Sequence, residues 1–218
     1  MKAPDGAIGI LGGTFDPVHR AHLALARAAL EKLGLAQVRW IPAGCPWHRG
    51  TPAASSADRL AMVKAAIQEE PRFVLDECEA KSGAPGYSVV TLERLREELG
   101  PARPIVLLMG ADAFLGLPRW HRWRELFELA HLAVATRPGF PLEALTSPLA
   151  EAFARRRLAS ADFSAPAGGI YPFELVAGTV SATEVREKIA AGASDAELLR
   201  LLTPPVLDYI RAHQLYRA

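Results

Sequence analysis

The chain has 218 residues, half of them apolar, so it is long enough to bury one sizeable core. The formal net charge is only +1, which argues against a broad nucleic-acid surface, so no nucleic-acid partner is expected. Two cysteines are too few for a disulfide framework, and no apolar run reaches the length of a signal-peptide core or a membrane span, so we expect a cytoplasmic protein with no membrane contact.

Short apolar runs alternate with helical patterns along the chain, which is typical of a parallel α/β sheet. Strands are predicted at Ala7–Leu11, Gln37–Pro42, Phe73–Asp76, Ile105–Met109 and His131–Thr136, with a sixth near Ile170–Val176. Two helical faces are predicted between them, one through Leu23, Ala26, Leu30 and Leu33 and one through Val89, Leu92, Leu95 and Leu99. The predicted fold is a Rossmann-like, doubly wound parallel sheet with helices on both faces.

The C-terminal part of the chain is predicted to be helical. A less regular stretch, Pro138–Gly169, indicates a helix and a surface loop. One helix is then predicted from Ser181 to about Ala191, and a final helical region from Leu198 to His213. Because no internal repeat and no long linker are present, we expect a single domain over residues 1–218, with a small C-terminal helical part at about 181–218.

The first predicted strand runs into Gly12-Gly-Thr-Phe-Asp-Pro-Val-His19-Arg-Ala-His22, after which a helical pattern begins. In an open parallel sheet, ligands bind beyond the carboxyl ends of the strands. Glycines let the backbone approach a ligand closely, and a helix start presents unpaired N–H groups to an anion. His19 and His22 are three residues apart and project to one side, so the segment predicts a polyphosphate cradle of two imidazoles beside free amides.

This segment has simpler explanations. Gly12-Gly13 alone also marks ordinary strand-to-helix turns. His19 and His22 are spaced to bind a metal, but no further ligand follows at usable spacing, so we expect no protein-bound metal. The glycine pattern is neither that of a dinucleotide-binding fingerprint nor that of a P-loop.

A second constellation is Ser181-Ala-Thr183-Glu184-Val-Arg186. Taken alone it is a capping box, in which Ser181 caps the helix and Glu184 reaches back to the cap N–H. It also leaves the Thr183 hydroxyl and the Arg186 guanidinium near a second helix start. Two helix starts of this kind predict that both converge on one triphosphate.

Together the two segments resemble those of the bacterial nicotinate-nucleotide adenylyltransferases. Gly12 to His22 resembles their G-G-T/S-F-D-P-x-H-x-G-H segment, and Ser181 to Arg186 resembles I-S-S/A-T-x-I-R. Five further segments lie between them in the family's order, and the match extends to Gln214-Leu-Tyr216. The five are Pro46-Trp-His-Arg49, Gly86-Tyr-Ser88, Gly110-Ala-Asp112, Trp120 after Leu117-Pro118, and Arg137-Pro-Gly139. Two positions depart from the pattern, because Ala21 replaces the usual glycine and His121 stands where tyrosine is often found.

The resemblance implies an enzyme that joins the AMP part of ATP to nicotinate mononucleotide, giving deamido-NAD and pyrophosphate in NAD biosynthesis, with Mg²⁺ accompanying ATP. It implies catalytic roles for His22, His19 and Arg186, with His22 stabilising the transition state. The ATP-binding residues would be Gly12, Gly13, Thr14, Phe15, His19, His22, Asp112, Ser181, Thr183 and Arg186. The mononucleotide-binding residues would be His48, Arg49, Ser88, Trp120 and His121, with Trp120 stacking on the pyridine ring.

Other functions stay open at this point. The nearest are adenylyltransferases acting on nicotinamide mononucleotide or on phosphopantetheine, and a more distant one is a non-catalytic nucleotide-binding module. Several residues also have structural explanations: Trp120 as a core or loop anchor, His48-Arg49 as a solvated loop, Asp112 as a helix N-cap and Arg155–Arg157 as a solvated face. The oligomeric state is not readable from the sequence.

Overall fold

A computed structural model describes residues 6–45, 50–83, 85–137, 145–175 and 180–217. It contains a six-stranded sheet with the strand order β3-β2-β1-β4-β5-β6. The strands are β1 (Ile8–Gly13), β2 (Gln37–Pro42), β3 (Phe73–Leu75), β4 (Ile105–Gly110), β5 (His131–Thr136) and β6 (Ile170–Glu174). All six predicted strands are therefore confirmed, and the parallel, Rossmann-like fold is the expected one.

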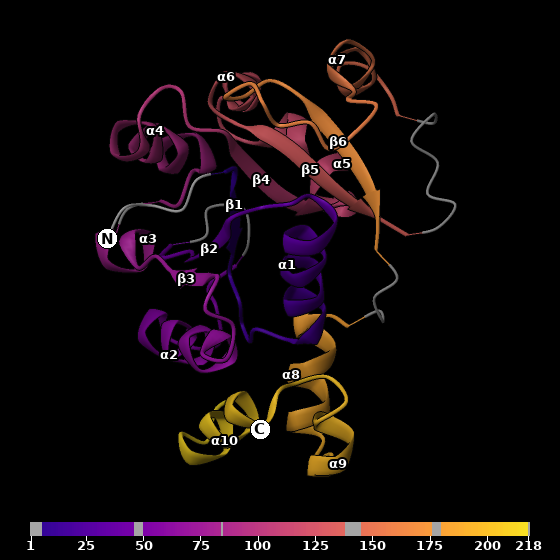
Figure 1. The fold of residues 1–218 in the computed structure, drawn as a ribbon. Helices are drawn as coiled ribbons and strands as arrows, with labels where there is room; N and C mark the ends of the chain where they lie inside the picture. Colours follow the sequence, from indigo (N-terminus) through magenta and orange to yellow (C-terminus); the bar gives the residue numbers. More distant parts are fainter. Residues whose placement is uncertain (1–5, 46–49, 84, 138–144, 176–179, 218) are drawn as a thin grey trace. The chain divides into compact units, whose positions relative to one another are not determined.

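Helices connect the strands and follow the last of them (Figure 1). The α-helices are α1 (Arg20–Lys32), α2 (Ser56–Ile67), α3 (Cys78–Ser82), α4 (Ser88–Leu99), α5 (Ala111–Leu115), α6 (Leu126–Leu129), α7 (Leu149–Arg156), α8 (Ala182–Ala190), α9 (Asp195–Leu198) and α10 (Pro204–Ala212). Two 3₁₀ turns, η1 (Leu117–Arg119) and η2 (Trp123–Glu125), lie between α5 and α6. No helix within the described ranges is long and apolar enough to cross a membrane.

Contacts along the chain group it into two compact units. Unit 1 comprises residues 1–11, 25–38 and 87–176, and unit 2 comprises residues 12–24, 39–86 and 177–218. Both units draw on separated stretches of sequence, so neither corresponds to a simple half of the chain. The expectation of a single domain over residues 1–218 stays a prediction.

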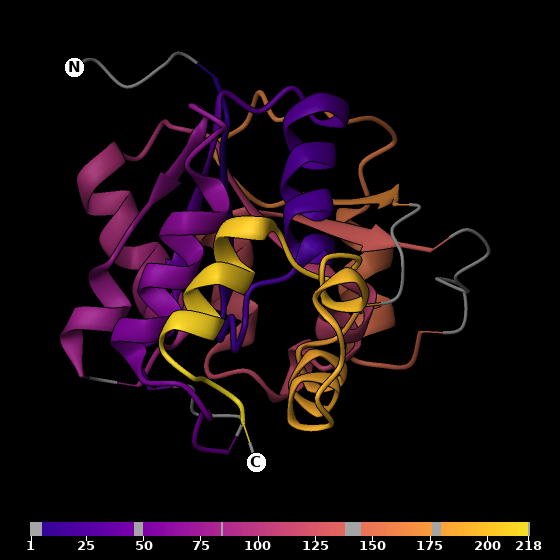
Figure 2. The same cartoon turned by 90° about the horizontal axis from the view of Figure 1, so that it is seen from below.

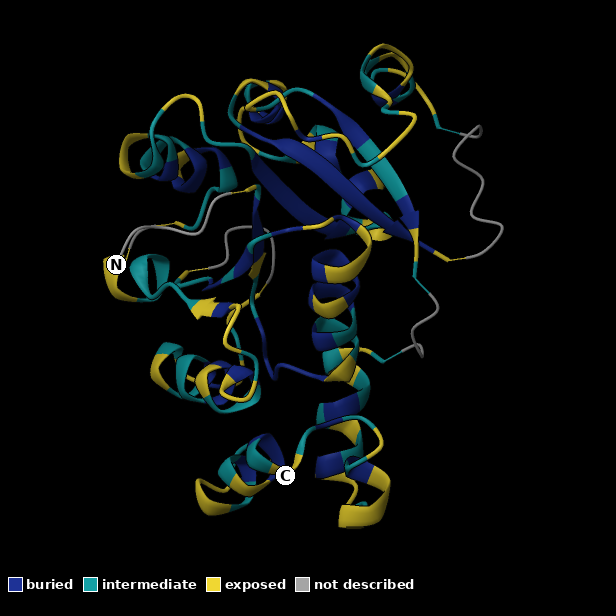
Figure 3. Ribbon diagram, viewed as in Figure 1, coloured by how far each residue is buried: buried dark blue, intermediate teal, exposed yellow. Residues whose placement is uncertain are grey.

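The core of unit 1 is built on β4 and β5, which Figure 3 shows as buried along their length. Their apolar runs have no polar alternation because a strand inside a parallel sheet is covered on both faces. The edge strand β6 contains Pro172, which a ladder tolerates only where one side of the strand is unpaired. The helix α4 packs against α6 in the same unit.

In unit 2, α10 packs along α2, and both Figure 1 and Figure 2 show the two helices side by side. The Tyr209 hydroxyl on α10 donates to Asp58 Oδ1 on α2 at 3.0 Å. The predicted helical region Leu198–His213 is wrong at its start: α9 already ends at Leu198, and the helix within the region, α10, begins at Pro204. Pro204 and Pro205 have no backbone N–H to donate inside a continuous helix. A helix tolerates proline in its first turn, so a new helix begins here.

Candidate functional site

The loop after β1 exposes backbone and buries one aromatic ring. Phe15 has a φ of 50°, a left-handed conformation that is strained for a residue with a bulky side chain. Its ring is buried and lies 5.6 Å, centroid to centroid, from the ring of Trp40. Gly12 is exposed, and a Cβ built there would meet no protein atom within 4 Å. The loop thus turns sharply around an anchored ring and presents its glycine backbone outwards.

His19 and His22 lie together where α1 begins, as expected. Their rings are stacked with centroids 3.7 Å apart, and the His19 backbone N–H donates to His22 Nδ1 at 3.2 Å. Because Nδ1 of His22 is an acceptor, the proton of its neutral ring resides on Nε2, which is then a donor. Within the described residues, no group of three or more histidine, cysteine or acidic side chains is placed to hold a metal ion, and the absence of a protein-bound metal stays a prediction.

The backbone N–H groups at this helix start were expected to be free, but three of them already have hydrogen-bond partners. The Arg20 N–H donates to Leu201 O at 2.8 Å, and the His22 N–H donates to His19 O at 3.0 Å. The His19 N–H is also occupied, by the His22 ring. An anion at this position would therefore meet imidazoles rather than these three amides, which corrects the predicted cradle.

His19 is held in its neutral form. Its side chain is 7% exposed, and burial lowers the pKa of the imidazole from its ordinary 6.5 to about 4. At neutral pH the ring is consequently an uncharged hydrogen-bonding group. Positive charge at this site has to come from another residue.

This burial predicts a specific pH dependence of stability. Between pH 6.5 and about pH 4 the unfolded His19 binds a proton that the folded one does not, so the free energy of unfolding falls as the pH is lowered through this window. The loss should approach about 3 kcal/mol for this residue. Urea unfolding from pH 7.5 to 4 measures it, with His19→Asn as the non-titrating comparison. If the free energy of unfolding depends on pH in the same way in both proteins, His19 is not neutral in the folded state.

Arg186 provides the positive charge. It extends from α8, whose N-cap Ser181 accepts a hydrogen bond from the Glu184 N–H at 3.1 Å through its hydroxyl. Arg186 donates through one terminal nitrogen to the backbone oxygen of Asp16 at 2.7 Å and through the other to Thr183 Oγ1 at 3.3 Å. The guanidinium is 31% exposed, so it is positioned by the protein and still reaches solvent.

The two helix starts are thus brought together within unit 2. Arg186 on α8 contacts Asp16, which lies three residues before His19 and 170 residues away along the chain. Imidazoles, a guanidinium and a hydroxyl around one loop form a set of donors suited to phosphate oxygens. The complete capping box predicted at Ser181 is found instead one helix later, at Ser194 and Glu197 of α9, within the part of the chain that the structure describes.

Asp16 is a site residue to which sequence analysis assigned no role. It is 6% exposed, and its carboxylate accepts hydrogen bonds from the amides of Ala53 at 2.8 Å and Ala54 at 3.0 Å. The Tyr216 hydroxyl donates to it at 2.8 Å. These partners are 37 to 200 residues away in sequence, so no local pattern indicates them.

Arg59 was also missed, and it supports the same loop from α2. Its side chain is 1% exposed and donates to three backbone oxygens: Thr14 at 2.8 Å, Ala43 at 2.6 Å and Gly44 at 3.0 Å. Burial lowers the pKa of this guanidinium, and the nearby Asp16 charge opposes that effect. Arg59 also borders a cavity of about 400 Å³ that Gly44, Ala53 and Ala54 help to line.

The remaining candidates that the structure describes, Asp112, Ser88, Trp120 and His121, are in unit 1. Asp112 follows β4, which pairs with β1. It is exposed in the first turn of α5, whose N-cap is Gly110, so the N-cap alternative for Asp112 is wrong.

Ser88, Trp120 and His121 belong to one local arrangement. Ser88 is the first residue of α4, where backbone N–H groups have no partner inside the helix. The ring of Tyr87, just before it, lies 4.5 Å from the ring of His121. Trp120 follows η1 and is half-buried. Trp123, three residues later, is the buried tryptophan of this segment. The core explanation therefore fits Trp123 rather than Trp120, and the loop-anchor explanation for Trp120 stays a prediction.

The turn after Trp120 is tied to α4. Arg122 has a φ of 52° and donates to Glu93 Oε1 on α4 at 2.7 Å and to Glu125. These contacts fix the backbone of the residues that follow Trp120. His48 and Arg49, the other two predicted mononucleotide residues, lie outside the described residues, as does Pro138-Gly139 of the predicted Arg-Pro-Gly turn.

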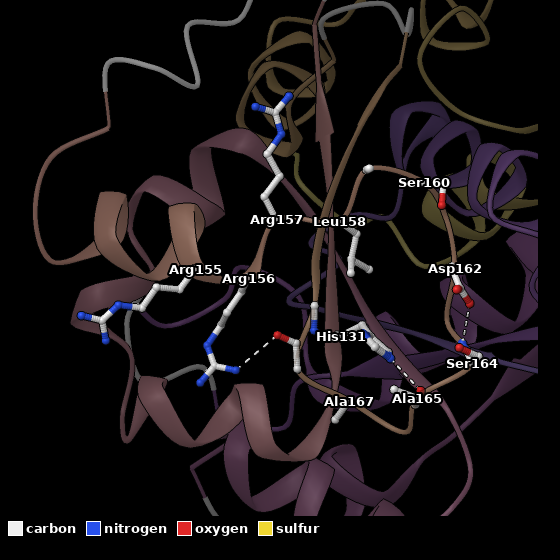
Figure 4. Close-up of a pocket in the computed structure, with 13 residues that line it drawn as sticks. His131, Arg155, Arg156, Arg157, Leu158, Ser160, Asp162, Ser164, Ala165 and Ala167 are labelled. Carbon is white, nitrogen blue, oxygen red and sulfur yellow. Dashed lines mark hydrogen bonds between the residues drawn. The ribbon is translucent and has the colours of Figure 1, made fainter.

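A cavity of about 500 Å³ in unit 1 contains the Arg155–Arg157 cluster (Figure 4). The three arginines point in different directions, and Arg156 donates to Gly168 O at 3.3 Å and stacks on the Phe127 ring. Both ring nitrogens of His131 are occupied, one by Ala165 O at 2.8 Å and one by the Gly169 N–H at 3.0 Å. Arg155 and Arg157 are exposed, as the solvated-face explanation expects, and the three arginines do not converge on a common ligand position.

The sheet order and the family comparison together identify a nucleotidyltransferase of the α/β class, because residues 10–188 match the family described as cytidylyltransferase-like. The chain is 50% identical over 214 residues to the "Probable nicotinate-nucleotide adenylyltransferase" of Dechloromonas aromatica (strain RCB), covering 96% of this chain and 97% of that one. It is 46% identical over 215 residues to the protein of the same name from Laribacter hongkongensis (strain HLHK9), covering 99% and 96%. The chain belongs to the nicotinate-nucleotide adenylyltransferase family.

The fold is also found among solved structures. The Plasmodium falciparum nicotinic acid mononucleotide adenylyltransferase complexed with NaAD superimposes with a TM-score of 0.73 and 16% sequence identity, covering 97% of both chains. At this identity the likeness concerns the arrangement of the chain, which agrees with the observed strand order.

Proposed function

We propose that this chain transfers the adenylyl group of ATP to nicotinate mononucleotide, releasing pyrophosphate and forming deamido-NAD for NAD biosynthesis. The observation that carries the proposal is the contact between Arg186 and Asp16, which brings an arginine of α8 to the loop leading into His19 and His22. Family membership supports the choice of substrates, since close relatives over nearly the whole chain bear the name of this activity.

The proposed reaction needs little acid–base chemistry. An oxygen of the mononucleotide phosphate attacks the α-phosphorus of ATP, a new P–O bond forms, and the bond to the β-phosphate oxygen breaks so that pyrophosphate leaves with the electron pair. The attacking phosphate is largely ionised at neutral pH, so no general base is required. The protein has to align two anions and offset charge on the transferring and leaving phosphates.

The described donors fit these tasks. Nε2–H of His22 would donate a hydrogen bond to the α-phosphate as negative charge develops there. Neutral His19 would hydrogen-bond to the phosphates next to His22. Arg186 would offset charge on the leaving phosphates, and Thr183, whose oxygen accepts from Arg186, would donate its hydroxyl proton. Gly12 to Phe15 and Ser181 would contact ATP through the backbone or the cap, and Asp112 would bind ribose hydroxyls.

Mg²⁺ would accompany ATP rather than occupy a protein site. It prefers oxygen ligands, whereas the donors around His19 are mainly nitrogens and the Asp16 carboxylate is already bonded to two amides and a phenol. The phosphates and water would supply its ligands. When bound, the ion adds positive charge to the triphosphate.

Five residues would bind the mononucleotide. Trp120 would stack on the pyridine ring, and amides near Ser88 and His121 would meet its carboxylate. His48 and Arg49 would bind the 5′-phosphate. A cytoplasmic location also belongs to the proposal, and two cysteines that form no disulfide, Cys45 and Cys78, are consistent with a reducing compartment.

Pyrophosphate release tests the proposed function. ATP should be combined with nicotinate mononucleotide, nicotinamide mononucleotide or phosphopantetheine under identical conditions. We expect the highest kcat/KM with nicotinate mononucleotide. A preference for either of the other acceptors would reassign the substrate, and ATP binding without release from any acceptor would indicate a non-catalytic module.

Trp120→Ala should raise the KM for nicotinate mononucleotide about tenfold, because stacking of a heterocycle on an aromatic ring contributes on the order of 1–3 kcal/mol. The KM for ATP should change little. Trp120→Phe keeps an aromatic face and is the matched control. It should raise the KM for nicotinate mononucleotide less than Trp120→Ala does. Steady-state kinetics with each substrate varied in turn gives both constants, and an effect on ATP alone would contradict the stacking role.

A further inference from the structure

The C-terminal tail reaches the proposed phosphate-binding site. Tyr216 lies beyond the end of α10, and its hydroxyl donates to Asp16 Oδ1 at 2.8 Å. Both Gln214 and Tyr216 have positive φ values, 52° and 62°, which are unfavourable for residues with side chains. Strained backbone persists only where its surroundings hold it, so the tail is constrained to bring the phenol to Asp16.

Arg186 can bind Asp16 in two ways, through the backbone oxygen of Asp16 or through its carboxylate. At present Arg186 donates to the Asp16 backbone oxygen at 2.7 Å, whereas its distance to carboxylate Oδ2 is 3.9 Å. A buried carboxylate attracts a neighbouring guanidinium strongly, and a close pair would take Arg186 away from a substrate phosphate. What limits this attraction is the set of donors that already stabilise the carboxylate.

Tyr216 is one of three such donors. The Ala53 amide binds Oδ2, and the Ala54 amide shares Oδ1 with the Tyr216 hydroxyl. Burial and the adjacent Asp16 charge raise the pKa of the phenol, so it remains a protonated donor throughout the working range of an enzyme. Without the hydroxyl, Oδ1 would lose one of its two partners and the carboxylate would turn towards Arg186.

We propose that Tyr216 is a positioning residue for adenylyl transfer: through Asp16 it keeps the Arg186 guanidinium on the Asp16 backbone oxygen and directed at the phosphates of ATP. Tyr216 itself touches no substrate. This inference rests on the proposed function for its kinetic consequences, while its effect on ATP affinity is independent of the acceptor.

The test is Tyr216→Phe, which removes one oxygen atom. We expect kcat/KM for ATP to fall about tenfold, because small displacements of a positioned group have large kinetic effects. The KM for nicotinate mononucleotide should stay within about twofold, since the resemblance assigns no mononucleotide contact near Tyr216. ATP affinity measured by calorimetry without an acceptor should weaken in parallel.

Tyr209→Phe is the matched control. Tyr209 also donates its hydroxyl to an aspartate, Asp58, and also fixes the C-terminal part of the chain, but it contacts none of the proposed site residues. It should lower the thermal midpoint without changing the kinetics. An equal loss of activity in Tyr209→Phe and Tyr216→Phe would reduce the role of Tyr216 to general stability and overturn the proposal.

Two further measurements separate the remaining explanations. In an Arg186→Ala background, Tyr216→Phe should cause no further loss of ATP affinity or of kcat/KM. If it lowers them as much as in the wild type, Tyr216 does not act through Arg186. 4-Aminophenylalanine at position 216 restores a donor at the same place and should restore ATP affinity, which also tests the proposal if Tyr216→Phe folds poorly. Wild-type inactivity with every acceptor would reject the proposed function, whereas unchanged ATP affinity in folded Tyr216→Phe would reject the positioning role.

Discussion

Replacing His22 by alanine is expected to lower kcat by about 100- to 1,000-fold, the usual cost of removing one donor to charge that develops in a transition state. The geometry supports this choice because the His19 N–H donates to His22 Nδ1, which places the ring proton on Nε2. The KM for ATP should rise less than kcat falls, since the interaction strengthens as charge accumulates. Single-turnover measurements of pyrophosphate release give the chemical step directly.

His22→Gln and His213→Ala are the comparison variants. Glutamine places an amide N–H near the position of Nε2 and should retain more activity than alanine. His213 is likewise stacked on an aromatic ring of the same unit, that of Tyr209 at 4.1 Å, but it lies outside the proposed site, so its substitution should leave turnover unchanged. Retained turnover in folded His22→Ala would remove the catalytic assignment.

Replacing Arg59 by methionine should have the largest effect on stability. Methionine keeps much of the apolar stem but leaves the oxygens of Thr14, Ala43 and Gly44 without their donor. Leaving a buried acceptor unsatisfied costs about 1–3 kcal/mol, so we expect a loss of about 3 kcal/mol or more. Activity should also fall at temperatures where the protein remains folded, because Thr14 belongs to the loop that leads to His19.

Arg72→Met is the control for this experiment. Arg72 is an exposed arginine of the same unit, paired with Glu70 at 3.1 Å, and such surface pairs contribute no more than about 1 kcal/mol. Urea unfolding compares the two variants with the wild type. A loss in Arg59→Met no larger than that in Arg72→Met would show that the three carbonyl groups are satisfied without the guanidinium.

The sequence was enough to predict the six strands, the helices α1, α4, α8 and α10, and the two helix starts, whereas α2 was missed. Their signals are local: an apolar run such as Ile105–Met109, the spacing of His19 and His22, and a hydroxyl cap at Ser181 each depend on neighbours within a few residues. The same local rules misjudged the amide of Arg20, because its acceptor, Leu201 O, belongs to a distant segment.

The support of the proposed site became visible only in the folded chain. Sequence analysis assigned no role to Asp16, Arg59 or Tyr216, yet the fold joins all three around the loop that precedes His19. Hydrogen-bond partners separated by 45 to 200 residues leave no periodicity in the chain, since their encounter depends on how several helices and strands pack. The chemistry of the helix starts was therefore readable from their residues, whereas the contacts that orient Arg186 required the folded chain.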